Sequence, residues 1–132
     1  MELVPYAFFY GRCQEALDFY KSVFGGSYEA MRIADSPMKD QFPPEAANGV
    51  MHASFSAPGV KFFASDGREA KPIDPDAGNI SLGLNADTDA ERIVKALAEG
   101  GKTVMPLEPA FWGGKFAMVV DKFGNEWMIT AP

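Results

Sequence analysis

The sequence contains very little of the chemistry that most metal and redox sites use. Among its 132 residues there is one cysteine, Cys13, and one histidine, His52. A single cysteine excludes an intrachain disulfide and a zinc site built on several thiolates. A single histidine excludes a two-histidine metal site within one chain. Basic residues are also scarce, and the net charge of -6 argues against a nucleic-acid partner.

Long apolar runs are missing as well. Residues 1–5 show no basic segment followed by an apolar stretch, so we expect no signal peptide. No apolar run is long enough to span a bilayer, so we expect no membrane partner. The single cysteine suits a reducing compartment, and we expect a cytoplasmic protein. What the chain does have is phenylalanine, with eleven copies, which predicts a core or a pocket rich in aromatic rings.

The first half of the chain begins with a strand and a helix. An apolar run at 3–10 predicts the strand. Apolar residues spaced by three and four positions predict a helix over Cys13–Phe24, and Gly25-Gly26 ends it. Its dipole would lower the pKa of Cys13, whereas the place of this residue on the apolar stripe puts it in the core.

The second half repeats this pattern. Alternation over 79–85 predicts a half-buried strand. Thr88 and Glu91 have the spacing of a capping box at the start of a second helix, which ends at Gly100-Gly101. Three strand-like runs follow each helix: 28–33, 50–56 and 60–65 in the first half, and 102–105, 115–121 and 126–130 in the second.

The predicted class is therefore α+β, one domain over 1–132 made of two modules with the order strand, helix and three strands. We place the first module at about 1–66, a linker at 67–77 and the second module at about 78–132. The proline-rich stretch 35–49 predicts a loop over one edge of the first module.

Several local motifs resemble those of a known superfamily. The stretch 16–25 resembles the first-helix signature of the vicinal-oxygen-chelate superfamily (glyoxalase, bleomycin resistance proteins and dioxygenases), and 120–127 resembles its final hairpin. Six motifs in order resemble its PhnB-like subfamily, whose members have carried the name 3-demethylubiquinone-9 3-methyltransferase: Pro5-Tyr6, 15–20, 51–53, 64–66, 111–113 and 121–124. The resemblance implies a half-barrel cleft lined by both modules.

The resemblance also implies where metal ligands would lie. Such relatives take ligands from the first and last strands of each module. These positions fall on Pro5, on Phe63 or Ser65, on Asn79 and on Met128. Proline and phenylalanine cannot bind a hard divalent ion, and Met and Asn are poor ligands for one. We therefore expect neither the usual metal nor another cofactor.

Strand alternation predicts which side chains line the cleft. If Pro5 and Asn79 face it, then Phe9 also does, while Tyr6 and Phe8 pack under the helix. The expected lining is apolar with a few polar points, which suits a small organic ligand. The candidate ligand-binding residues are Phe9, Phe63, Ser65, Asn79, Phe111, Trp112 and Met128.

A few residues carry candidate chemistry. His52 is a ligand donor or a general base, or else a structural histidine bonded to a loop. Asp66 orients His52 as a second catalytic residue, binds a polar group of the ligand, or caps the turn before Gly67. Phe111 and Trp112 either close the cleft as a lid or anchor their loop by burying their rings. Arg32 either binds an anionic group or lies solvated on the surface, and Asp121 and Gly124 predict a tight turn.

Three functions follow in order of preference. The first is binding of a small organic molecule without the usual metal. The second is an enzyme of lyase, isomerase or dioxygenase type that uses His52 and Asp66 or an atypical metal site. Methyl transfer comes last, because the glycine pairs follow helices rather than a strand of a parallel sheet. The resemblance further implies a homodimer.

Overall fold

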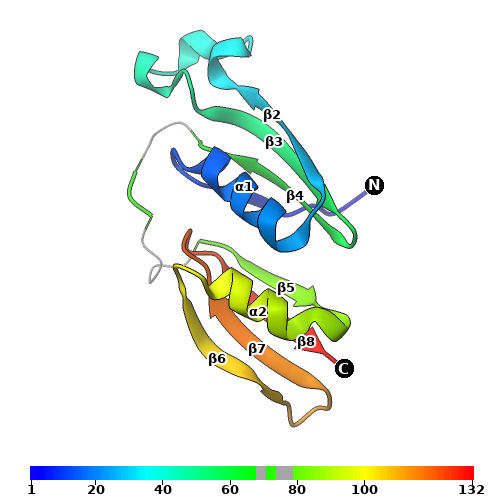
Figure 1. The fold of residues 1–132 in the computed structure, drawn as a ribbon. Coiled ribbons are helices and arrows are strands. Elements are labelled where there is room, and N and C mark those ends of the chain that lie inside the picture. The colour runs from blue at the N-terminus through cyan, green and yellow to red at the C-terminus, as the bar shows by residue number, and fades with distance from the viewer. Residues whose placement is uncertain (68–70, 74–78) are drawn as a thin grey trace. The chain divides into compact units, whose positions relative to one another are not determined.

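Each half of the chain forms a four-stranded sheet with one helix along one of its faces (Figure 1). The computed structural model describes residues 1–67, 71–73 and 79–132. It divides into two units, Met1–Ile73 and Asp74–Pro132, which are called here the first and the second module. Most of the predicted linker, 68–70 and 74–77, lies outside the described residues.

The first module has the strand order β1-β4-β3-β2, with β1 parallel to β4 and the other pairs antiparallel. The predicted loop at 35–49 lies between β2 and β3 and contains short 3₁₀ turns. The elements are β1 (Tyr6–Phe8), α1 (Cys13–Phe24), β2 (Ser27–Arg32), β3 (Val50–Ala57) and β4 (Val60–Ser65).

The second module repeats this topology with the order β5-β8-β7-β6 and a parallel β5–β8 pair. Its elements are β5 (Ser81–Asn85), α2 (Ala90–Ala98), β6 (Lys102–Pro109), β7 (Lys115–Val120) and β8 (Glu126–Ala131). Both modules thus have the predicted order of strand, helix and three strands, and the α+β class is confirmed. Among the described residues, no helix is long and apolar enough to cross a membrane.

Aromatic rings fill the core between α1 and the first sheet. Tyr20 on α1 packs edge-on against Phe62 with ring centroids 5.4 Å apart, and Phe62 stacks on Phe55 at 4.8 Å. Phe9 also packs against Tyr20, at 6.1 Å. All four side chains are buried, and aromatic pairs at such distances contribute about 1 kcal/mol each beyond the area they bury. Three of the eleven phenylalanines thus lie in this core.

The second glycine of each pair is required by a close backbone approach that recurs in both modules. A Cβ at Gly26 would lie 2.1 Å from the carbonyl oxygen of Ser56, and one at Gly101 would lie 2.1 Å from that of Val120. No side chain fits at either distance. Ser56 lies in β3 and Val120 in β7, the same strand of each module. The glycine pairs therefore let the chain leave each helix directly against the sheet.

The predicted capping box at the start of α2 is wrong. The helix begins at Ala90 after a 3₁₀ turn at Asp87–Asp89, and no side chain caps it. Asp89 instead binds the guanidinium of Arg92, with Oδ2 and Nη2 2.6 Å apart. Asp89 thus pairs with a charged side chain one turn ahead in the helix. The predicted capping bonds of Thr88 and Glu91 do not form.

Candidate functional site

The face of the first sheet opposite α1 carries four rings, Tyr6, Phe8, His52 and Phe63, called here the aromatic face. Tyr6 stacks on Phe8 with ring centroids 5.2 Å apart. His52 lies 5.1 Å from Phe63 and 5.6 Å from Tyr6. Tyr6 is 39% exposed and Phe8 is 40% exposed. Large aromatic surfaces that stay open in this way are typical of binding sites.

The predicted orientation of the first strand is wrong. Phe9 is fully buried against Tyr20 of α1, and Ala7 is buried too, whereas Tyr6 and Phe8 take the open face. Phe9 is therefore a core residue and lines no ligand site. The run 3–10 is apolar on both alternating sets, so the pattern could not decide which set faces the helix. A register error of one residue exchanges the two faces.

The same correction applies to Pro5, which was expected to hold the first metal-ligand position. Pro5 precedes β1, and its carbonyl oxygen accepts a hydrogen bond from the Phe63 amide at 2.8 Å. Tyr6 is the residue that pairs with Phe63 across the β1–β4 ladder. Tyr6 and Phe8 are thus the site residues that sequence reasoning missed, although their aromatic spacing of two positions was visible in the strand.

His52 lies in the middle of β3, with its side chain exposed on the aromatic face. Its Nδ1 is 2.9 Å from the Tyr6 hydroxyl oxygen. Burial raises the pKa of Tyr6, so the phenol stays protonated at neutral pH and can donate this hydrogen bond. Nδ1 accepts this hydrogen bond in the His52 tautomer that carries its proton on Nε2. The pair offers one proton donor and one acceptor beside two apolar rings.

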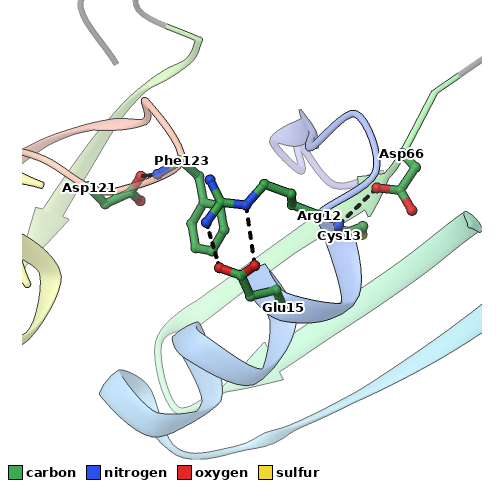
Figure 2. A network of polar contacts seen from close by, with 6 residues as sticks. All are labelled: Arg12, Cys13, Glu15, Asp66, Asp121 and Phe123. Carbon is green, nitrogen blue, oxygen red and sulfur yellow. Dashed lines mark hydrogen bonds and ion pairs between the residues drawn. The ribbon is translucent and has the colours of Figure 1, made fainter. Parts of the chain in front are cut away.

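Asp66 lies directly after β4, and Figure 2 shows its carboxylate bound to the backbone amide of Cys13. Its Oδ1 accepts hydrogen bonds from the amides of Gly11 at 2.7 Å and Cys13 at 2.8 Å. Its Oδ2 accepts one from the Val50 amide at 2.8 Å. The carboxylate thus caps the N-terminus of α1 from a distant part of the sequence. The structure does not bring His52 and Asp66 together as a hydrogen-bonded pair.

The first turn of α1 also has a local ion pair. The Arg12 guanidinium binds the Glu15 carboxylate, with Nη2 and Oε2 2.6 Å apart (Figure 2). Both side chains are largely exposed, and pairs of this kind add only about 0.3–0.5 kcal/mol to a helix. The remote cap on the Cys13 amide, and not this ion pair, is therefore the main polar stabilisation of the helix start.

The Ser65 hydroxyl and the Cys13 thiol, both close to the Asp66 carboxylate, are buried. The Ser65 hydroxyl donates to the carbonyl oxygen of Val50 at 3.2 Å and accepts from the Gly67 amide at 3.0 Å. Ser65 is only 5% exposed, so little of it is available to a ligand. Burial, together with the negative charge of Asp66, raises the pKa of the Cys13 thiol. The helix dipole does not lower the pKa of this thiol enough to offset these effects, so the thiol stays neutral and unreactive.

The second module confirms the predicted alternation of its sheet. Trp127 and Ile129 on β8 are buried. Met128, between them, is half-buried and points to the other face of the sheet, where it pairs with Gly83 of β5. Asn79 is exposed two residues before β5. Met128 thus lies on the predicted face of its sheet, opposite Trp127 and Ile129, and its role in binding a ligand stays a prediction.

The loop between β6 and β7 holds Phe111 and Trp112. Phe111 is 97% exposed and Trp112 is 57% exposed. The rings pack edge-on against each other with centroids 4.8 Å apart, and Trp112 contacts Phe116 at 5.4 Å. The alternative in which the two rings anchor the loop by burial is therefore wrong. Their use as a lid stays a prediction.

The predicted tight turn of the last hairpin is confirmed. The Gly124 amide donates to the carbonyl oxygen of Asp121 at 3.0 Å. The Asp121 carboxylate accepts from the amides of Phe123 (Figure 2) and Asn125, and from the indole nitrogen of Trp127 at 2.9 Å. Asp121 is fully buried, so this motif serves the structure of the hairpin.

The side chains at the expected ligand positions do not fit a hard divalent metal. Across the described residues, no group of three or more His, Cys, Asp or Glu side chains converges. On the first sheet the open positions hold Tyr6, Phe8 and Phe63 beside the single imidazole of His52. Aromatic carbon offers no ligand atom to such an ion. The rings on this face of the first module can instead contact the face or edge of an aromatic ligand.

Comparison with known proteins supports one family. Residues 2–129 match the model of the Glyoxalase/Bleomycin resistance protein/Dioxygenase superfamily. The chain therefore belongs to this superfamily. The Escherichia coli protein YjdN is 28% identical over 142 residues, which cover 98% of this chain and 95% of that protein.

Solved structures agree with this assignment. The protein PA1353 from Pseudomonas aeruginosa is 39% identical, with a TM-score of 0.81, over 99% of this chain and 97% of that one. A PhnB protein from Bacillus cereus, provisionally named a 3-demethylubiquinone-9 3-methyltransferase, is 24% identical over the full length of both chains, with a TM-score of 0.74. The latter likeness shows the fold alone.

We predict that replacing Asp66 destabilises the protein. Asp66→Asn keeps one acceptor but turns an amide group toward the Val50 amide, so we expect a loss of about 2 kcal/mol in the free energy of unfolding. Asp66→Ala leaves three amides without their acceptor and should cost more. Urea unfolding of the purified variants measures both values.

The matched control is Asp40→Asn, at an exposed carboxylate in a 3₁₀ turn of the same module. It should change the free energy of unfolding by less than about 0.5 kcal/mol. An Asp66→Asn variant as stable as this control would contradict the structural role of Asp66.

Proposed function

We propose that the chain binds a small planar organic molecule on the aromatic face of the first module, without the divalent metal of many of its relatives. The observation that supports this most directly is the cluster of Tyr6, Phe8, His52 and Phe63 on one open face, with centroid distances of 5.1–6.0 Å between neighbouring rings. Exposed rings at this spacing can stack on or edge against a planar ligand. The polar point of the site is the Tyr6–His52 pair.

Two features favour a planar ligand with one polar atom. The rings supply flat apolar surface, and Met31, opposite His52 on β2 and 49% exposed, adds a polarisable thioether. The His52 Nε2 and the Tyr6 hydroxyl supply the only hydrogen-bonding side-chain groups among these five residues. Few polar groups within an apolar surface fix the orientation of a ligand.

The second candidate function is an enzyme that transfers a proton with His52. The sequence paired His52 with Asp66, but the structure offers Tyr6 instead, at 2.9 Å from Nδ1. A tyrosine that holds one imidazole nitrogen leaves the other nitrogen to exchange a proton with a bound molecule. This observation favours acid–base chemistry over the metal-dependent reactions of the superfamily.

Methyl transfer ranks last. Three of the four strands in each sheet pair antiparallel, and the glycine pairs end helices instead of following a strand into a parallel sheet. The name carried by the Bacillus cereus relative supplies no further support at 24% identity.

We also propose that the chain pairs with a second copy of itself in the cytoplasm. Exposed apolar side chains support the pairing: Val104 and Met105 are each 48% exposed on the edge strand β6, and the loop after this strand carries the exposed rings of Phe111 and Trp112. The buried thiol of Cys13 is compatible with a reducing compartment.

Light scattering on the purified chain tests the pairing. A mass of twice 14.3 kDa, reduced toward one chain in the variant Met105→Lys, is the expected result, because a charge on the edge strand opposes association. A single-chain mass at concentrations up to about 100 μM, far above the dissociation constants of most stable pairs, would reject the dimer.

Ligand binding on the aromatic face is tested with 1-naphthol, and decahydro-1-naphthol serves as the saturated counterpart. Naphthol should shift the aromatic NMR signals of Phe8, Phe63 and His52, and the saturated alcohol should bind more weakly. Phe8→Ala should lower the affinity about fivefold, as expected for the loss of one aromatic pair. Ser56→Ala, at an exposed position on the same strand as His52, should leave it unchanged.

Tyr6→Phe separates the two candidate functions. It keeps the ring and removes only the hydroxyl, so a binding protein should retain naphthol affinity within about twofold, because one exposed hydrogen bond contributes little. Loss of turnover of a bound compound in Tyr6→Phe, with binding intact, would support the enzyme. Naphthol shifts confined to residues outside the aromatic face would reject both.

A further inference from the structure

A pocket of the first module is built around Arg32, and none of the residues that line it belongs to the aromatic face. Its volume of about 340 Å³ lies in the range of small-molecule sites. It forms where four segments meet: the start of α1, the end of β2, the loop before β3 and the residues after β4.

Arg32 is held in one position by two neutral acceptors. Its Nη2 donates to Oε1 of Gln14 at 2.5 Å, and its Nη1 donates to the carbonyl oxygen of Asn48 at 3.1 Å. The amide nitrogen of Gln14 is directed toward the hydroxyl of Tyr28 and the carboxylate of Asp18. This network fixes which end of the Gln14 amide faces Arg32, so the guanidinium is preorganised.

Among the described residues, no ion pair neutralises the charge of Arg32. The ion pairs found there include Arg12–Glu15, Lys61–Glu2 and Arg92–Asp89, and none of these involves Arg32. A guanidinium has five N–H bonds, and Arg32 uses two of them, so three remain for a ligand. Arg32 is also half-buried, and a fixed cation that is partly withdrawn from water favours an anion beside it.

The other charges of the pocket limit what that anion can be. Asp66 lines the pocket, but its two oxygens are occupied by three backbone amides. Glu45 is an exposed carboxylate in the lining. One guanidinium against two carboxylates favours a ligand with a single negative charge over a dianion such as phosphate. Ile33 and Ala46 supply an apolar wall.

We propose that this pocket binds the carboxylate of a small aliphatic acid, with the guanidinium of Arg32 as the anchor and the wall of Ile33 and Ala46 beside its alkyl chain. The planar fork of a guanidinium matches the two oxygens of a carboxylate. This site is separate from the proposed function and does not depend on it.

The test uses propionate, with propionamide as the uncharged analogue and inorganic phosphate as the dianion. Propionate should shift the Arg32 Nε–H signal and the backbone amide signals of Gly49 and Gly67 in NMR spectra of the full chain, while the ring signals of Tyr6 and Phe8 stay in place. Propionamide should bind at least about tenfold more weakly, because it lacks the charge that pairs with Arg32. Phosphate should also bind at least about tenfold more weakly, because the carboxylates of Asp66 and Glu45 repel its second charge.

Variants give the site its controls. Arg32→Met keeps the alkyl stem and should weaken propionate binding about tenfold, whereas Arg92→Met, at an exposed arginine of the second module, should not change it. Glu45→Gln removes a repelling charge from an exposed position, so it should fold normally and bind propionate about twofold more tightly.

Three results would overturn the proposal. They are the absence of any shift at Gly49 and Gly67, an equal affinity for propionamide or phosphate, and unchanged propionate binding in Arg32→Met. The Glu45→Gln variant keeps the test decisive if Arg32→Met fails to fold, because a weaker affinity in Glu45→Gln contradicts the charge balance. His52→Ala, a variant of the aromatic face, should leave propionate binding intact.

Discussion

The carboxylate of Asp66 is the interaction on which the arrangement of the first module depends. Its two oxygens accept three backbone hydrogen bonds, from Gly11, Cys13 and Val50. These amides belong to the turn after β1, the first residue of α1 and the first residue of β3. One buried charge thereby joins three segments at the end of β4. Hydrogen bonds to a charged group of this kind are stronger than neutral ones, which explains how a single side chain can hold so many elements.

The hydrogen bonds of Asp66 also determine which side chains of β1 face the solvent. Gly11 follows Tyr10, a non-glycine residue with φ of 50°, in the turn that leads from β1 into α1. The Phe9 amide donates to the carbonyl oxygen of Ser65, directly before Asp66. Phe9 is thereby placed under α1, and Tyr6 and Phe8 take the opposite face. The aromatic face is a consequence of this register.

Local patterns predicted much of the fold. The helix over Cys13–Phe24 was located at both ends, because its apolar spacing is regular and Gly25-Gly26 must end it. The alternation of polar and apolar residues in 79–85 also placed Leu82 and Leu84 correctly, on the same face as buried Trp127 and Ile129. Where polar residues lie on one side of a helix or strand, the sequence alone predicts which face is buried.

The predictions were wrong where a strand has no polar face, or where hydrogen-bond partners are far apart in the sequence. In 3–10 both faces are apolar, so Phe9 was assigned to the site and Tyr6 to the core. Asp66 is separated by more than fifty residues from the two amides of Gly11 and Cys13 that it caps, and no local spacing reports such a contact. The partner of His52 was missed for the same reason, since Tyr6 lies 46 positions away.

We propose that this member of the superfamily recognises its ligand with rings and one imidazole rather than with a metal. The chemistry of Tyr6, Phe8 and Phe63 on the open face supports this. The most direct measurement is the metal content of the chain, purified without chelator and without metal-affinity resin. We expect far less than one metal ion per chain. One tightly bound ion per chain that is lost in His52→Ala would contradict it.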